Sequence, residues 1–207
     1  MRTIKSQIKG QLLYYNITLP EKFDNNNWSK AMLSWMEELS WRFTTADSTL
    51  KSRLRHYNFI YHETLDISNQ LRFYCRQNHK KDYTLLQSVP GIGPLTAIGL
   101  LSELGDLRKF KSLKELAGYI GLVPGILQSG DSKIITGITP RSKGLLRSYL
   151  IEASWQAVRH DPVMQQYYRS HVGKKPNKII VKVAHKLVSR IRAVIKTETP
   201  YQLGVLK

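Results

Sequence analysis

The segment from Trp28 to Asn78 contains neither proline nor glycine, and this constrains the fold more than any other feature of the sequence. Proline ends or kinks a helix and glycine weakens its interior, so a stretch of this length without either predicts long helices. Residues at alternating three- and four-residue spacing are Met36, Ser40, Phe43, Asp47, Leu50, Leu54, Tyr57, Tyr61, Thr64, Ser68, Leu71 and Cys75. Several of them are polar, so the heptad pattern is imperfect. We expect a helical arm or hairpin that dimerises, with two ordinary packed helices as the alternative.

Three tryptophans, Trp28, Trp35 and Trp41, lie at the start of this segment. No basic groove is evident near them in the sequence. We therefore expect core or interface residues rather than platforms on which nucleic-acid bases stack.

The remainder of the chain also favours helices. Residues 1–15 predict a short basic amphipathic helix with Ile4, Ile8 and Leu12 on one face. From Lys81 onward, helices are expected at 83–88, 94–104, 111–120, 141–160 and 176–196, and the irregular stretch 121–140 has β-favouring residues that suit a short hairpin. The predicted fold class is mainly α, with a coiled-coil-like arm at 1–80, a compact helical domain at 81–200 and a tail at 201–207.

The charge is strongly positive, with 32 Lys+Arg against 15 Asp+Glu and a formal net charge of +17. Residues 132–207 hold 15 of the basic residues and only 3 of the acidic ones. No apolar stretch is long enough to span a membrane, and the single cysteine, Cys75, excludes a disulfide scaffold. We expect a cytoplasmic, nucleoid-associated protein whose partner is a polyanion, most simply nucleic acid.

A tight turn between two predicted helices is the first sharp motif. Leu86-Gln87-Ser88-Val89-Pro90 precede it, and Gly91-Ile92-Gly93-Pro94 form it. This pattern is typical of a helix-hairpin-helix, in which Gly91 and Gly93 let backbone N–H groups approach a DNA phosphate while Ile92 enters the core. Such binding does not depend on base sequence. A plain turn between helices is the alternative.

A serine and two cations form the second motif. Ser129 precedes Gly130 in the irregular stretch, and Lys133 and Arg141 follow within twelve residues. A serine hydroxyl needs activation before it acts as a nucleophile, and nearby cations stabilise a phosphoryl transition state. From spacing alone, a simple Ser-Gly turn is the favoured interpretation.

Two clusters of basic residues suit phosphate contacts. Arg141, Lys143 and Arg147 crowd the start of the helix predicted at 141–160, where positive charge opposes the helix dipole but attracts anions. A solvated helix face is the alternative. Along the last helix, a basic stripe lies over an apolar one and consists of Lys178, Lys182, Lys186 and Arg190. This stripe would also suit an anionic membrane surface, but the other motifs favour nucleic acid.

Metal-ligand patterns are absent from the sequence. The six histidines show no ligand spacing with one another or with Cys75, and the carboxylates of residues 1–80 lie on predicted helix rather than at strand ends. A two-metal nuclease site is therefore not evident, and we expect no cofactor in this chain.

Taken together, these motifs resemble the C-terminal domain of insertion-sequence 110 (110/116/902) family transposases. The matching pieces are SVPGIGPLTAIGLLSELGDLRKFKSLKELAGYIGLVP, QSGDSK, GITPRSKGLLRSYLIEASWQAVRHDP and VAHKLVSRIRAVIK, in the same order over about 110 residues. Residues 1–17 resemble the family's basic helix that follows an N-terminal domain, and residues 28–80 resemble its coiled-coil linker. The resemblance implies a DNA recombinase in which Ser129, with Ser132 as the fallback, attacks a DNA phosphate, guided in some members by a bridge RNA.

The family's N-terminal RuvC-like domain, with its acidic Mg²⁺-binding quartet, has no counterpart in these 207 residues. The resemblance therefore implies a truncated transposase, inactive alone, that binds element ends and target DNA, with a bridge RNA and a second copy as further partners. The alternatives are a non-catalytic helix-hairpin-helix DNA-binding module and, less favoured, a DNA repair protein with that motif.

Overall fold

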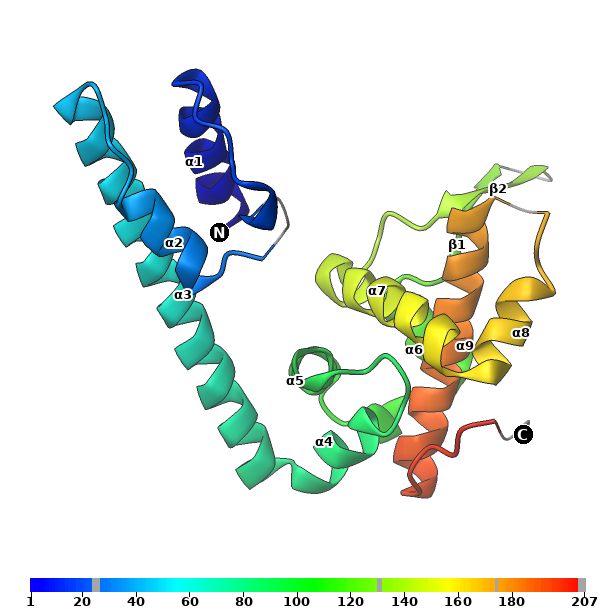
Figure 1. Cartoon of the computed structure of the whole chain (residues 1–207). Coiled ribbons are helices and arrows are strands. Elements are labelled where there is room, and N and C mark those ends of the chain that lie inside the picture. Colours follow the sequence, from blue (N-terminus) through cyan, green and yellow to red (C-terminus); the bar gives the residue numbers. More distant parts are fainter. Residues whose placement is uncertain (24–26, 130–131, 174, 205–207) are drawn as a thin grey trace. The chain divides into compact units, whose positions relative to one another are not determined.

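The computed structural model describes residues 1–23, 27–129, 132–173 and 175–204, and within 126–136 it describes the backbone alone. These residues form nine α-helices, two short 3-10 helices and one two-stranded antiparallel sheet, which confirms the mainly α prediction (Figure 1). The chain divides into two compact units, Met1–Gln70 and Leu71–Lys207, with the boundary inside a helix.

The first unit contains α1 (Arg2–Tyr14), η1 (Glu21–Phe23), α2 (Lys30–Glu37) and most of α3 (Thr44–Asn78). Amphipathic α1 turns Ile4, Ile8 and Leu12 inward, and α2 begins where the Ser29 side chain accepts a hydrogen bond from the Met32 backbone N–H. The core of this unit comprises Ile4, Ile8, Leu12, Phe23, Met32, Met36, Leu50, Leu54 and Tyr57. One apolar cluster thus joins all four elements.

The window without proline or glycine is not one continuous helix. It breaks between Glu37 and Thr44, where Leu39 and Trp41 pack, partly buried, against the core of the first unit. Trp28 and Trp35 pack there too, which agrees with the core role expected for the three tryptophans. Burial of apolar side chains therefore turns the chain at a place that has no helix-breaking residue.

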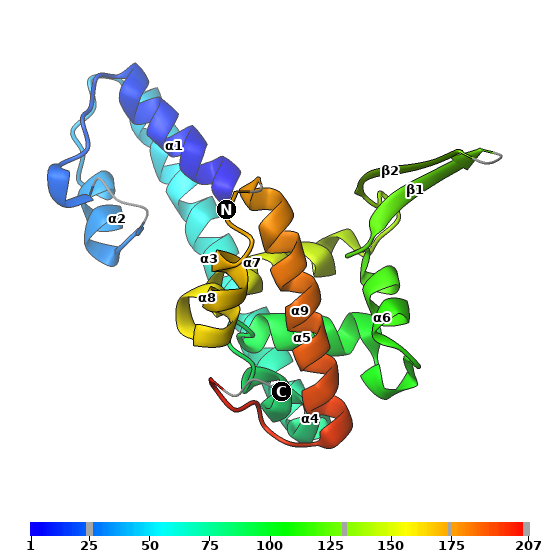
Figure 2. The ribbon, with the colours of Figure 1, turned by 90° about the vertical axis from the view of Figure 1, so that its right-hand side faces the viewer.

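The second unit holds the end of α3 and all the elements that follow it. These are α4 (Lys80–Gln87), α5 (Pro94–Leu104), η2 (Leu107–Lys109), α6 (Leu113–Ile120), β1 (Pro124–Ser129), β2 (Ser132–Ile138), α7 (Gly144–His160), α8 (Pro162–Arg169) and α9 (Pro176–Thr197). Helix α9 contacts α4, α6, α7, α8 and η2, so its apolar face forms the centre of this unit. Figure 2 shows α9 crossing the unit and the β1–β2 hairpin projecting beyond α6 and α7.

Several helix starts in this unit differ from the predicted ones, since the helix expected at 83–88 begins at Lys80 and the helix expected at 111–120 begins at Leu113. Helix α7 begins at Gly144 rather than at residue 141, because the backbone N–H of Thr139 donates to the carbonyl of Val123 at 3.0 Å and extends the base of the hairpin. Helix α8 was not predicted at all, although buried Asp161 caps it and Pro162 occupies its first position. No helix that the structure describes meets the length and hydropathy needed to cross a membrane.

Candidate nucleic-acid interface

Helices α4 and α5 are joined by the tight turn that the sequence predicts. The backbone N–H of Val89 donates to Leu86 and that of Ile92 donates to Val89, while Ile92 itself is buried. Gly91 adopts a left-handed conformation with φ of +86°, which favours glycine. Gly93, with φ of −80°, is the N-cap of α5 and makes no side-chain cap. The helix start therefore keeps backbone N–H groups that could donate hydrogen bonds to an anion.

The two glycines of this turn have different surroundings. A Cβ on Gly91 would lie 2.1 Å from the carbonyl oxygen of Ala153 and 3.1 Å from the backbone N of Ala157, both on α7. A Cβ on Gly93 would meet nothing within 4 Å. Gly91 thus lies against the backbone of α7, which leaves no room for a side chain. Gly93 has the open space that a phosphate would need.

The β1–β2 hairpin is anchored to α7 by a partly buried arginine. Arg147 Nη1 donates to the carbonyl of Thr139 at 2.8 Å and to that of Gly121 at 3.4 Å. Gly121, with φ of +87°, packs so closely that a Cβ would lie 2.1 Å from the Cβ of Ser142. Arg147 therefore positions the base of the hairpin, a role that its sequence placement among basic residues does not indicate.

Ser129 is the last residue of β1, and Ser132 is the first residue of β2 and its register partner. The two serines therefore close the far end of the hairpin. The side chains of Ser129, Ser132 and Lys133 lie outside what the structure describes, and Gly130 and Asp131 lie outside it altogether. The position of Ser129 is thus described only at the level of strand and register.

Two cations lie between the hairpin and α7. Lys143 Nζ is 3.2 Å from Glu103 Oε2 on α5 and lies 5.8 Å from the centre of the Tyr119 ring. Its hydrogen bond to Glu103 raises the pKa of Lys143 above its usual value. Arg141 is exposed. The structure therefore ties Lys143 to α5 and leaves Arg141 at the surface.

The exposure of the side chains in the basic stripe on α9 decreases along the helix. Lys178 and Lys182 are exposed, whereas Lys186 lies half-buried with its Nζ 4.1 Å from the centre of the Tyr167 ring on α8. Burial, and then the neighbouring charge of Arg190, lowers the pKa of Lys186. The N-terminal half of the stripe is thus better placed for phosphate contacts than the C-terminal half.

Polar contacts that the sequence did not indicate join residues of the second unit that lie far apart in the chain. Asp161, only 1% exposed, accepts from the backbone N–H of Val163 and from the hydroxyl of Tyr201. Burial and this hydrogen bond raise the pKa of Tyr201 to about 12. Arg108 meanwhile pairs with Asp82 at 2.8 Å through two nitrogens. These partners are up to 40 residues apart, so no local pattern could reveal them.

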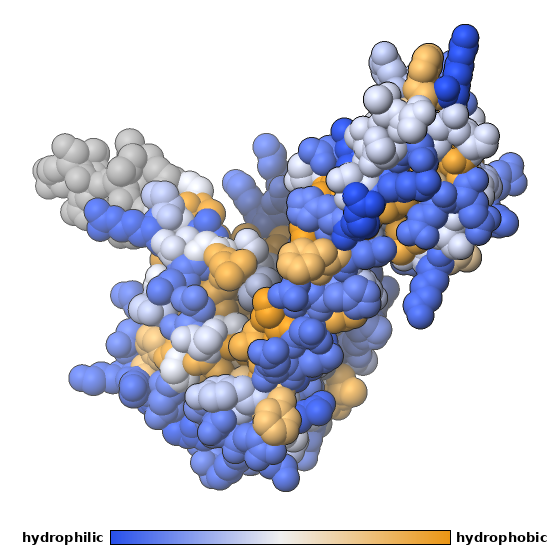
Figure 3. Space-filling model, turned by 90° about the vertical axis from the view of Figure 1, so that its left-hand side faces the viewer, coloured by the Kyte–Doolittle hydropathy of each residue, from blue (hydrophilic) through white to orange (hydrophobic). Residues whose placement is uncertain are grey.

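The surface mixes charged and apolar side chains, and Figure 3 shows apolar patches that interrupt a largely hydrophilic face. Among the residues that the structure describes, there is no group of three or more His, Cys, Asp or Glu side chains that could hold a metal ion.

Comparison with known proteins identifies the family. Residues 83–169 match the model of the transposase IS116/IS110/IS902 family. The transposase for insertion sequence element IS1111A of Coxiella burnetii is 26% identical over 96% of this chain and 55% of its own length. A putative transposase of Sinorhizobium fredii, y4qE, is 25% identical over 93% of this chain and 46% of its own length. The pilin gene-inverting protein of Moraxella bovis is 33% identical over 60% of the chain.

The chain spans about half the length of the first two relatives. The matched residues include the α4–α5 turn, the hairpin that ends in Ser129 and Ser132, and helices α6, α7 and α8. A family of transposases acts on DNA, which agrees with the positive charge of the second unit. Residues 83–169 therefore carry the domain of the transposase IS116/IS110/IS902 family, and the two relatives that match more than nine tenths of this chain are a transposase and a putative transposase.

Proposed function

We propose that this chain is the DNA-binding C-terminal part of a serine transposase, and that Ser129 is its nucleophile. The observation that carries the proposal is the place of Ser129 at the far end of a projecting hairpin inside the family-matched residues. At such a tip, a backbone phosphate of duplex DNA can reach the serine without displacing the helical core. Ser132, its register partner, is the second candidate.

In the proposed reaction, the Ser129 hydroxyl gives up its proton as its oxygen attacks a DNA phosphorus atom. The bond from phosphorus to a deoxyribose oxygen breaks, that oxygen leaves as a hydroxyl after taking up a proton, and a phosphoserine link joins protein and DNA. The exposed side chain of Arg141 lies near the hairpin base, at the opposite end of β2 from Ser132, and suits a flanking phosphate rather than the one that Ser129 attacks. Gly93, Lys143 and the outer lysines of α9, Lys178 and Lys182, would hold flanking phosphates. A metal-bearing acidic domain would supply the remainder of a composite site, so the chain alone would be inactive.

A covalent trap tests this proposal. The full chain is incubated with DNA carrying element ends, alone and with a separately supplied acidic domain from the family. We expect a DNA adduct only in the mixture, lost in Ser129→Ala and kept in Ser132→Ala. An adduct that survives Ser129→Ala and disappears in Ser132→Ala would move the nucleophile to Ser132. Intact DNA binding without any adduct would instead favour the non-catalytic DNA-binding module.

We further propose that α3 mediates dimerisation. Ile60, Thr64, Ile67, Leu71 and Tyr74 follow alternating four- and three-residue spacing, and all but Thr64 are apolar. Ile67 and Tyr74 are 54% and 57% exposed. Ile60 packs against the core of the first unit, so the exposed apolar part of this row runs from Ile67 to Tyr74. An exposed apolar row on a helix is stabilised by pairing with a second copy.

Sedimentation equilibrium tests the dimer. Ile67→Glu is expected to shift the chain toward monomer at micromolar concentration, whereas Asp66→Glu, a conservative change one position away, is the matched control. A monomeric parent chain, or a dimer that Ile67→Glu leaves intact, would argue against pairing through α3.

A further inference from the structure

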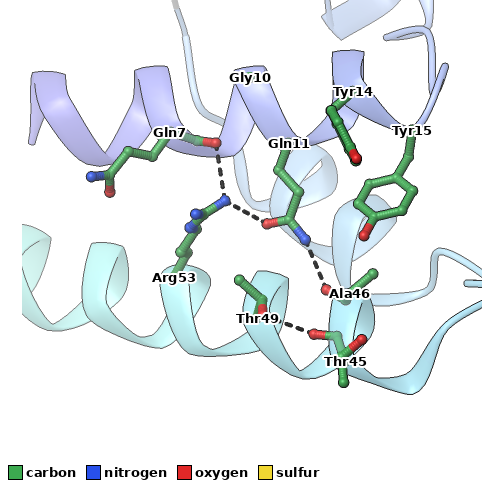
Figure 4. Close-up of a pocket in the computed structure, with 9 residues that line it drawn as sticks. All are labelled: Gln7, Gly10, Gln11, Tyr14, Tyr15, Thr45, Ala46, Thr49 and Arg53. Carbon is green, nitrogen blue, oxygen red and sulfur yellow. Dashed lines mark hydrogen bonds between the residues drawn. The ribbon is translucent and has the colours of Figure 1, made fainter.

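A pocket of about 410 Å³ lies between α1 and α3 in the first unit, and none of the residues that line it belongs to the α4–α5 turn, the hairpin or the basic stripe of α9. Figure 4 shows Arg53 at one end of it and the rings of Tyr14 and Tyr15 at the other. Gly10 lines the α1 side and Thr49 lines the α3 side. The pocket thus combines a charged donor, aromatic surface and open space.

The polar end of the pocket is held by three hydrogen bonds. Arg53 Nη1 donates to Gln11 Oε1 at 2.7 Å and to the carbonyl of Gln7 at 3.2 Å. Gln11, only 8% exposed, in turn donates from Nε2 to the carbonyl of Ala46 at 2.8 Å. Among the described residues, the hydrogen bonds of Arg53 all come from Nη1, so its other guanidinium nitrogens retain donors for a ligand.

The aromatic end has an exposed ring. Tyr14 is 81% exposed, and its ring meets that of Tyr15 edge-on with centroids 5.0 Å apart. Tyr15 meets Trp41 in the same way at 5.1 Å. Most of the Tyr14 ring is therefore open to contact with another flat ring.

Gly10 has no structural reason to be glycine. It lies inside α1, where glycine is unfavourable, and a Cβ there would meet nothing within 4 Å. Because residues three and four apart share a helix face, Gly10 lies in one row with Gln7 and Tyr14. Its missing side chain is what keeps the middle of the pocket open.

We propose that this pocket binds one unpaired nucleobase, stacked on Tyr14 and hydrogen-bonded by Arg53. A planar aromatic ligand with acceptor atoms on its edge matches the ring at one end and the guanidinium at the other. The net charge of +17 favours a base that belongs to a nucleic acid. The inference rests on the proposed function only in that the ligand is nucleic acid, since no residue of the Ser129 hairpin lines the pocket. A single-stranded segment and a free nucleotide offer the same chemistry.

Fluorescence anisotropy of the full chain tests the pocket. The probes are a labelled 12-nucleotide single strand, as DNA and as RNA, and the duplex of the same sequence. Gly10→Leu fills the pocket and Tyr14→Ala removes the stacking ring, and each is expected to weaken single-strand binding about 10-fold while duplex binding changes less than about twofold. Gly118→Leu is the matched control, because Gly118 is another helical glycine with nothing within 4 Å of a Cβ, and should change neither.

Circular dichroism confirms that each variant is folded. Unchanged single-strand affinity in folded Gly10→Leu, or an equal loss for single strand and duplex, would overturn the inference. Competition by adenosine monophosphate that Gly10→Leu abolishes would support the base pocket and identify a free nucleotide as its ligand. Since duplex binding and the covalent adduct are measured separately, failure of the pocket leaves the Ser129 proposal standing.

Discussion

The contact between Gly91 and α7 predicts a large loss of stability in Gly91→Ala. The residue has φ of +86°, and placing a Cβ in the left-handed region costs about 1–2 kcal/mol. That Cβ would also lie 2.1 Å from the carbonyl oxygen of Ala153, so the turn or α7 must move by about 1 Å. Forcing extra volume into a packed site costs a further 1–3 kcal/mol or so. We expect a total destabilisation of about 2–5 kcal/mol.

Gly93→Ala is the control for this prediction. Its φ of −80° suits alanine, and its Cβ would have nothing within 4 Å, so we expect a change below about 1 kcal/mol. Urea unfolding followed by circular dichroism measures both variants, and hydrogen exchange of α7 amides locates the loss. Equal stability of the two variants within about 0.5 kcal/mol would refute the packing argument. Gly93, and not Gly91, is therefore the position at which a larger side chain tests DNA binding without loss of the fold.

Three further predictions concern the hairpin, the salt dependence and the pH dependence. Arg147→Met should destabilise the chain by about 1–3 kcal/mol and speed hydrogen exchange in β1 and β2, because two carbonyls lose a charged donor; unchanged exchange would contradict this. DNA affinity should fall steeply with salt, and Lys178→Ala should reduce the logarithmic salt slope by about 1; a flat dependence would contradict phosphate binding. Because the pKa of Tyr201 rises from 10.0 to about 12, the protonated hydroxyl stabilises the fold below pH 10 and this contribution disappears by pH 12. In urea unfolding, the free energy of unfolding of Tyr201→Phe should therefore fall less between pH 10 and pH 12 than that of the parent chain. An equal fall in both proteins would contradict this role of the Tyr201 hydroxyl.

Helix bounds were predictable where the signals are local. Helix α5 and helix α9 begin at Pro94 and Pro176, as expected from proline at the first helical position and from the apolar period that follows. The start of α7 was not predictable in this way. Thr139 and Pro140 look like a cap and a first turn, yet Thr139 pairs with Val123 across the hairpin instead. Pairing between distant residues overrides a local capping signal.

The sequence indicates which residues belong to the candidate site, but it does not indicate what each of them contacts. The glycines of the α4–α5 turn are indicated by the sequence, but only the fold separates the packed Gly91 from the open Gly93. The spacing on α9 places Lys186 in a stripe, but it cannot reveal that Tyr167 from α8 lies beneath its ammonium group. The pocket that holds Arg53 joins residues about 40 positions apart, which no periodicity detects.

The positive charge of the second unit therefore has two uses that composition cannot separate. Arg147 and Arg192 donate to backbone carbonyls, Arg192 Nη2 to that of Lys111 at 2.7 Å, so these cations hold loops to helices. Arg141 and Lys178 lie exposed. Loss of DNA binding in an Arg147 or Arg192 variant would follow from loosened structure, and only a change in salt slope without a change in stability identifies a phosphate contact. The number of phosphates that the chain neutralises must therefore be smaller than its net charge of +17 implies.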